Sequence, residues 1–206
     1  ITSFDNKFYK LLKKLDKKKY RDENNLFKAN AEKFLNEDIN FNKIIVKESK
    51  FEYFDKKYSI GNHDNLTILR DDLFDEVSTQ ESSQGIMFLY TKNLNNISDI
   101  NGDVVILDDI QDPGNIGTIM RTMIAVNFKN LILTKGSVDV YNPKTVRATM
   151  GGIFKLNIIY ETPENIIEFL KKNDYLIVST ALHKDSISYE KIIQKDKNAY
   201  IFGNEG

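Results

Sequence analysis

The sequence predicts an α/β protein built in two parts. Short apolar, β-branched runs alternate with helical stretches along the whole chain, and a polar stretch rich in turn-forming residues divides it near 91–102. At 206 residues, with 41% hydrophobic and 29% charged residues, the chain has enough apolar material for one or two domains with a sizeable core. We therefore expect one domain at 1–91, a linker at 92–102 and a second domain at 103–206.

The first half begins with a helical stripe of Phe4, Phe8, Leu11, Leu12 and Leu15, whose opposite face carries lysines. Short strand candidates follow at 26–29, 43–46, 66–69 and 86–90, and helical stretches at 30–36 and 71–77 lie between them. This alternation predicts a small α/β sandwich.

The second half shows a clearer α/β pattern. Its strand candidates are 104–107, 130–133, 156–159, 175–179 and 199–202, and its helix candidates are 115–126, 143–150 and 163–172. Because the connections between strands are about ten residues or longer, they fit crossovers in a parallel sheet that helices cover on both faces.

The first strand of this half leads into the run Asp-Pro-Gly-Asn-Ile-Gly-Thr-Ile-Met-Arg-Thr at 112–122. Pro113 and Gly114 end the strand, and Asn115 is the expected N-cap of the next helix. Gly117 leaves room for another backbone or a ligand to approach. Because ligands of open α/β sheets bind at the carboxyl ends of strands, Asn115 and Arg121 are expected to address one crevice there. The same residues also fit an ordinary strand-turn-helix corner with a surface arginine.

Several classes of site are disfavoured by what the sequence lacks. No third glycine follows Gly114 and Gly117 at the spacing of a dinucleotide-binding motif, and no Walker motif occurs. The chain has no cysteine and only two histidines, His63 and His183, so we expect no disulfide, no thiolate nucleophile and no metal site. No apolar run is long enough to span a membrane, which predicts a cytoplasmic protein without a membrane partner.

A basic segment near the start is the main candidate for contact with nucleic acid. The formal net charge is -1, so RNA binding would have to come from local patches. Lys17, Lys18, Lys19 and Arg21 are candidate phosphate contacts, and Tyr20 among them could stack on a base. The alternative is a solvated helix face, which is the usual fate of a run of charges.

Two later motifs join the 112–122 run. They are Tyr-Asn-Pro-Lys-Thr-Val-Arg-Ala-Thr-Met-Gly-Gly-Ile-Phe at 141–154 and Tyr-Ile-Phe-Gly-Asn-Glu-Gly at 200–206. Together the three resemble the SpoU (TrmH-like) family of RNA ribose 2'-O-methyltransferases in the knotted SPOUT superfamily. The first half is similar to the family's L30e-like RNA substrate-binding domain, through Lys-Lys-Lys-Tyr-Arg-Asp at 17–22 and Thr-Gln-Glu-Ser-Ser-Gln-Gly at 79–85. It departs at Asn30-Ala31, where the family usually carries Glu-Gly.

The resemblance implies methyl transfer from S-adenosylmethionine to a ribose 2'-hydroxyl in structured RNA, with rRNA favoured over tRNA, by a homodimer. It places Arg121 at the catalytic position and Asn115 beside it. Because a guanidinium stays protonated, Arg121 is a poor general base, and we expect it to grip a phosphate as a charged fork. Glu205 is then expected either to orient Arg121 or to accept the proton.

The other two motifs supply the remaining site residues that the resemblance implies. The turns after the last two strands would cradle the cofactor through Thr180, Ala181, Leu182, Gly203, Asn204 and Gly206. Lys144, Arg147 and Thr149 would contact RNA, unless 142–152 is simply a capped helix on a dimer surface.

Relatives continue past Gly206 with a tail that forms the knot and completes the cofactor pocket. We therefore expect weak or absent S-adenosylmethionine binding, and an inactive fragment, if 206 residues are the whole molecule. A non-catalytic RNA-binding protein with a degenerate SpoU domain is the alternative function.

Overall fold

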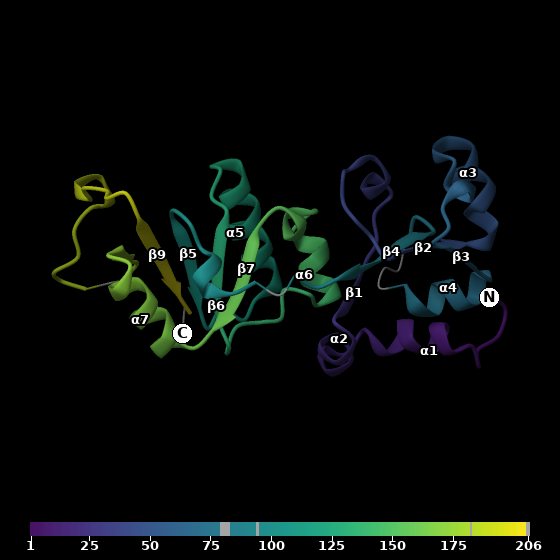
Figure 1. Cartoon of the computed structure of the whole chain (residues 1–206), viewed down its shortest axis with the longest axis horizontal. Coiled ribbons are helices and arrows are strands. Elements are labelled where there is room, and N and C mark those ends of the chain that lie inside the picture. Colours follow the sequence, from purple (N-terminus) through teal and green to yellow (C-terminus); the bar gives the residue numbers. More distant parts are fainter. Residues whose placement is uncertain (79–82, 94, 182, 205–206) are drawn as a thin grey trace. The chain divides into compact units, whose positions relative to one another are not determined.

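The computed structural model describes residues 1–78, 83–93, 95–181 and 183–204. The chain divides into two compact units (Figure 1). The N-terminal unit comprises Ile1–Lys92 together with Tyr141–Arg147, and the C-terminal unit comprises Asn93–Val140 and Ala148–Gly206. A segment of the second half of the sequence thus belongs to the first unit.

The N-terminal unit contains a mixed four-stranded sheet in the order β1-β4-β2-β3. The strands are β1 (Leu26–Ala29), β2 (Lys43–Lys47), β3 (Leu66–Leu69) and β4 (Ile86–Thr91). β4 runs antiparallel to both β1 and β2, whereas β2 and β3 are parallel. All four predicted strands of this half are confirmed, because each is a compact apolar run between polar turns.

Helices cover this sheet. They are α1 (Lys7–Lys14), α2 (Lys18–Asn24), α3 (Phe51–Tyr58) and α4 (Asp71–Val77). Asn6 caps α1 by accepting hydrogen bonds from the amides of Phe8 and Tyr9, so Phe4 lies outside the helix and is 49% exposed. α1 and α4 bury Leu12, Phe74 and their apolar neighbours against Ile45 and Met87 of the sheet.

Two expectations for this half are wrong in detail. The predicted helix at 30–36 is a 3-10 helix, η1 (Glu32–Asn36), and α3 was not predicted at all. Of the α3 side chains, only Phe54 is fully buried, so the sequence carries no wide apolar stripe there.

The C-terminal unit contains a five-stranded sheet in the order β7-β6-β5-β9-β8, and every neighbouring pair is parallel. Its strands are β5 (Val104–Asp108), β6 (Asn130–Thr134), β7 (Asn157–Glu161), β8 (Leu176–Ser179) and β9 (Asn198–Gly203). The predicted parallel sheet is confirmed. Leu107, Leu131 and Leu133 are buried as fully as Ile106 and Ile132, which alternate with them, so both faces are covered.

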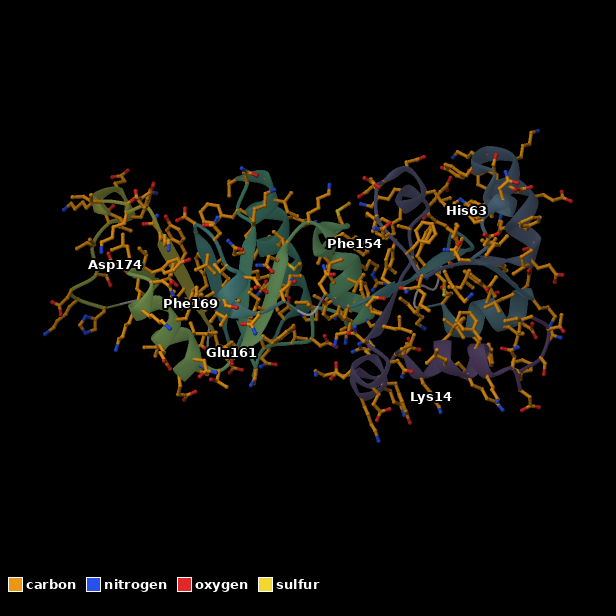
Figure 2. All side chains as sticks on the ribbon, viewed as in Figure 1. Lys14, His63, Phe154, Glu161, Phe169 and Asp174 are labelled. Carbon is orange, nitrogen blue, oxygen red and sulfur yellow. The ribbon has the colours of Figure 1, made fainter. Side chains whose placement is uncertain are left out.

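The helices of this half are α5 (Pro113–Ala125), α6 (Pro143–Ala148) and α7 (Pro163–Lys172). α7, which also carries Phe169 (Figure 2), packs Ile166 and Leu170 onto one face of the sheet. The rings of Phe169 and Tyr175 form a pair with centroids 5.6 Å apart. The chain moves from β5 through β6 to β7 in one direction and returns past β5 to β8. Because such crossovers are right-handed, α5 and α7 lie on opposite faces.

Asparagine side chains fix the strand register at the amino end of the sheet. Asn130 donates to the backbone carbonyls of Asn101 and Asp103 at 2.7 and 3.0 Å, and its own carbonyl accepts from Asn157 at 3.1 Å. Asn198 donates to the carboxylate of Asp103 at 2.9 Å. These bonds satisfy polar groups that the close packing of the strands would otherwise leave buried and unpaired.

Among the described residues, no helix is both long and apolar enough to cross a membrane.

Candidate active site

The site is built at the carboxyl end of β5, where the chain turns into α5. The N-cap of α5 is Asp112, whose carboxylate accepts a hydrogen bond from the Asn115 amide at 2.8 Å. The expectation that Asn115 caps this helix is therefore wrong. Pro113 needs no amide partner at the first helical position, so the helix begins two residues earlier than predicted. Asn115 is instead exposed in the first turn, and its side chain makes no hydrogen bond to the described part of the chain.

The turn before α5 is fixed by the neighbouring turn after β6. The Asp109 amide donates to Thr134 Oγ1 at 2.9 Å, and the Ile110 amide donates to Ser137 Oγ at 3.2 Å. Gln111 bridges the Asp109 carboxylate and the Gly136 carbonyl at 2.7 and 2.6 Å. These contacts position the start of α5, and the sequence reasoning did not find them because they join turns that are far apart in the chain.

Asn115, Thr118 and Arg121 form a row along α5 at a spacing of three residues, and all three are exposed. Side chains three residues apart are neighbours on a helix, so the row is a continuous polar strip about 9 Å long. The Arg121 guanidinium donates to Thr118 Oγ1 at 3.3 Å and contacts the Met150 sulfur at 3.4 Å. Thr118 therefore lies between Asn115 and Arg121 in this row and contacts Arg121 directly. The sequence alone assigned no role to Thr118.

Gly117 brings a second backbone against α5. A Cβ atom at this position would lie 2.5 Å from Ala148 Cβ and 2.7 Å from the Ala148 carbonyl carbon. The expected close approach is confirmed, and its partner is protein backbone. After Ala148 the chain leaves the helix because Met150 and Gly151 take φ values of +51° and +91°, so α6 ends two residues before the predicted boundary.

The motif at 141–154 is divided between the two units. In the N-terminal unit, Tyr141 is buried with its ring centroid 4.9 Å from that of Phe27, and the Lys92 ammonium lies 5.1 Å from its ring. Lys144 and Arg147 are exposed on α6 and keep the access to solvent that RNA contact requires. Thr149, in the C-terminal unit, is only 1% exposed, so the expectation that it contacts RNA does not hold.

Four of the six expected cofactor residues are described, and they lie at the carboxyl ends of β8 and β9. Thr180, Ala181, Gly203 and Asn204 are exposed, whereas Leu182, Glu205 and Gly206 lie outside the described residues. Gly203 pairs with Asp108 on the neighbouring strand β5, and a Cβ atom on Gly203 would meet no atom of the described residues within 4 Å. Burial raises the pKa of Tyr200 on the same strand. The backbone at this edge is therefore open to a ligand.

The basic segment contains both exposed and buried cations. Lys17, Lys18 and Lys19 are exposed on or beside α2, and Lys14 on α1 extends from the surface with its ammonium 5.3 Å from the Tyr20 ring (Figure 2). Arg21 is 2% exposed, and its guanidinium donates to the Leu15 and Asp16 carbonyls at 2.8 Å each. The expectation that Arg21 contacts RNA is therefore wrong, because its charge serves the joint between α1 and α2.

Acidic neighbours moderate the charge of this segment. Lys18 pairs with Asp22 at 2.6 Å, Lys19 with Glu23 at 3.8 Å, and Lys92 also reaches Asp22 at 2.6 Å. Burial raises the pKa of Asp22, but the hydrogen bonds from Lys18 and Lys92 outweigh it and the pKa falls below its ordinary value. No group of three metal-ligating side chains occurs within the described residues.

Comparison with known proteins identifies the family. The SpoU rRNA Methylase family matches residues 102–206, about half of the chain. The chain belongs to this family. The resemblance read from the three motifs is thereby confirmed.

Proteins named as rRNA methyltransferases match the rest of the chain as well. The Bacillus subtilis 23S rRNA (guanosine(2553)-2'-O)-methyltransferase RlmP is 29% identical over all of this chain and 82% of its own length. A solved rRNA methyltransferase from Sinorhizobium meliloti superposes with a TM-score of 0.85 at 25% identity, over 100% of this chain and 81% of that one. An AdoMet-bound structure of rRNA methyltransferase from the same organism matches equally well. The SpoU methyltransferase AviRb from Streptomyces viridochromogenes superposes with a TM-score of 0.83 at 18% identity, over 97% of this chain and 82% of that one, so the chain has the fold of SpoU methyltransferases.

Proposed function

We propose that this SpoU family member transfers a methyl group from S-adenosylmethionine to a ribose 2'-hydroxyl of rRNA. The observation that carries the proposal is the exposed row of Asn115, Thr118 and Arg121 at the carboxyl end of β5, the edge at which open α/β sheets bind ligands. The RlmP relative, named for this reaction on guanosine of 23S rRNA, matches the whole chain and supports the choice of substrate.

The reaction requires the 2'-oxygen to be aligned with the methyl carbon and the negative charge that develops on this oxygen to be stabilised. Methyl transfer forms a bond from the 2'-oxygen to the methyl carbon, breaks the bond from that carbon to the sulfonium sulfur, and releases the hydroxyl proton. Arg121 carries a permanent charge, so in our proposal its fork grips the phosphate beside the target ribose and stabilises negative charge developing on the 2'-oxygen. Asn115, whose side-chain amide makes no hydrogen bond to the described residues, would orient the same ribose. We propose Glu205 as the group that orients Arg121 or accepts the proton.

The residues at the ends of β8 and β9 fit the cofactor. Thr180, Ala181, Gly203 and Asn204 present exposed backbone and small side chains, and no atom of the described residues fills the space beside Gly203. We propose that these residues, with Leu182 and Gly206, hold S-adenosylmethionine, which supplies the methyl group when bound.

RNA would be held mainly by the N-terminal unit, which we propose as the L30e-like RNA-binding domain of 1–91, joined through 92–102 to the methyltransferase domain of 103–206. Lys17, Lys18, Lys19, Lys144 and Arg147 are exposed cations that would contact phosphates.

We further propose a homodimer that acts in the cytoplasm. Several large apolar side chains on β8, on β9 and on the connection between them are exposed to solvent. They are Ile177, Ile187, Tyr189, Ile193 and Phe202. Exposed apolar surface of this kind is typical of a contact with another protein surface, here a second copy of the chain.

The deciding experiment is incubation with a labelled methyl donor and unmethylated, transcribed 23S rRNA. Label should enter ribose 2'-O positions, and Arg121→Lys should lower kcat by about 100-fold, because a point charge cannot replace a bidentate fork. Arg70→Lys, at an exposed arginine paired with Asp72 in the N-terminal unit, is the matched control and should keep full turnover. Tight RNA binding without any incorporation would instead favour a non-catalytic RNA-binding protein.

A further inference from the structure

The Arg121 guanidinium is held by two neutral acceptors that come from different segments. Nη2 donates to Thr118 Oγ1, one turn earlier on α5, at 3.3 Å. Nη1 contacts Met150 Sδ, in the segment after α6, at 3.4 Å. Within the described residues, no carboxylate lies within ion-pair distance of this arginine. Among the described residues, this cation of the candidate site is thus oriented without being neutralised.

The choice of acceptors has a physical consequence. A carboxylate bonded to the guanidinium would form a charge-assisted bond and compete with an incoming phosphate for the same fork, so of the two roles proposed for Glu205 this arrangement favours that of proton acceptor. A hydroxyl and a thioether are much weaker acceptors, so they fix the plane of the fork at rest and release its N–H groups at little cost. Such a cradle suits a group that must meet a phosphate in one orientation.

The position of the sulfur is itself fixed by backbone. Met150 has a left-handed φ of +51°, which is uncommon for a side chain of this size, and Gly151 follows at +91°. Two residues earlier, Ala148 lies directly against Gly117 of α5. The Met150 side chain is 62% exposed, yet its sulfur is directed at Arg121 and not only at solvent.

From these contacts we propose that Thr118 and Met150 are positioning residues, which hold the Arg121 fork in the orientation that methyl transfer requires. The inference rests on the proposed function, in which Arg121 contacts the RNA phosphate. Thr118 and Met150 themselves touch no reacting atom and act only through the guanidinium.

Single-turnover methylation tests the role of Thr118. Thr118→Val removes the hydroxyl at nearly constant shape and should lower kcat about threefold to tenfold, the range expected for one hydrogen bond, with KM for the methyl donor unchanged. Thr118→Ser restores the acceptor and should recover most of the rate. Thr122→Val is the matched control and should leave kcat unchanged, because the one bond of Thr122 Oγ1 to the described residues is to the Thr118 backbone carbonyl, at 3.0 Å.

The dependence on Arg121 is tested by combining substitutions. In the Arg121→Lys background, Thr118→Val should cause no further loss, because the group that it positions is already gone. A full additional loss there, or an active wild type whose kcat is unaffected by Thr118→Val, would overturn the inference. A wild type that methylates no RNA would instead overturn the proposed function.

A readout without activity isolates the Met150 contact. The chain has four methionines, so 13C-methyl labelling gives four signals, and Met150→Leu identifies one of them. Arg121→Lys should shift the Met150 signal and leave those of Met87, Met120 and Met123 in place. If the Met150 signal does not shift in Arg121→Lys, the proposed contact between Met150 and Arg121 is refuted even if the enzyme is active. Met150→Leu should also lower the single-turnover rate constant about threefold.

Discussion

Gly117→Ala should damage both stability and turnover, because the new methyl group has no room. Its Cβ would lie 2.5 Å from Ala148 Cβ, whereas carbon atoms in contact settle at about 3.5–4.0 Å, so the two segments must separate by roughly 1 Å. Overpacking of this kind costs about 1–3 kcal/mol, and the better helix propensity of alanine returns up to about 1 kcal/mol. We expect a net loss of about 1–2 kcal/mol in the free energy of unfolding, measured by urea denaturation.

The same displacement should also reach the proposed catalytic group. Moving the Ala148 segment moves Met150, and a misplacement of about 1 Å in a catalytic arrangement can cost up to about 100-fold in rate. Gly152→Ala is the matched control: its Cβ would meet Ile124 Cδ1 at 2.8 Å, the flexible end of a side chain that can rotate away. Unfolding free energy and kcat should then stay near wild type. If Gly117→Ala proves as stable and as active as Gly152→Ala, the proposed link between this backbone contact and catalysis is refuted.

Two further predictions concern the basic segment. Arg21→Ala should lower the free energy of unfolding by about 1–3 kcal/mol, because the buried Leu15 carbonyl and the partly buried Asp16 carbonyl lose their donor. Lys17→Ala should instead leave stability within about 0.5 kcal/mol and weaken RNA binding with a salt slope smaller by about one. If Arg21→Ala weakens RNA binding in filter assays and keeps the free energy of unfolding in urea, Arg21 is an RNA contact after all. The lowered pKa of Asp22 means that its pairs with Lys18 and Lys92 stabilise the fold above its ordinary pKa of 3.8 and stop doing so as the pH falls through the lower folded value. Wild type should therefore exceed Asp22→Asn in stability at neutral pH, and the gap should close in acid; a gap that persists there would contradict the assignment.

Apolar periodicity predicted most of the fold, because a strand that is buried on both faces must be apolar throughout. Every strand of the parallel sheet was found in this way, with boundaries within about two residues. Periodicity failed where little is buried, as in α3, whose only fully buried side chain is Phe54. It also misplaced the cap of α5, because Asp112 and Asn115 are equally good capping residues and only the backbone conformation decides between them.

The candidate site was harder to predict, because residue type does not reveal exposure. A basic run contains Arg21 and Lys17 with equal formal charge, yet the chain buries one and exposes the other. Thr149 was expected to contact RNA because it lies in the 141–154 motif, but its side chain is buried, so motif membership does not reveal exposure either. Thr118 had a usable signal, since it lies midway between Asn115 and Arg121 at helical spacing, but Met150 depends on a positive φ that no composition rule predicts.

Under the proposed function, the division of residues between the two units places the expected RNA contacts and the proposed catalytic group in different units. Tyr141 packs against Phe27 within the N-terminal unit and brings Lys144 and Arg147 with it, so these cations belong to the same body as the lysines of α2. Arg121 and its two acceptors belong wholly to the C-terminal unit. Charge removal at Lys144 should therefore raise the Kd for RNA and leave the single-turnover rate constant at saturating RNA unchanged. Substitutions around Arg121 should instead lower that rate constant and leave the Kd for RNA unchanged. A Lys144→Ala variant with normal RNA affinity and a reduced kcat would show that α6 serves the catalytic step instead.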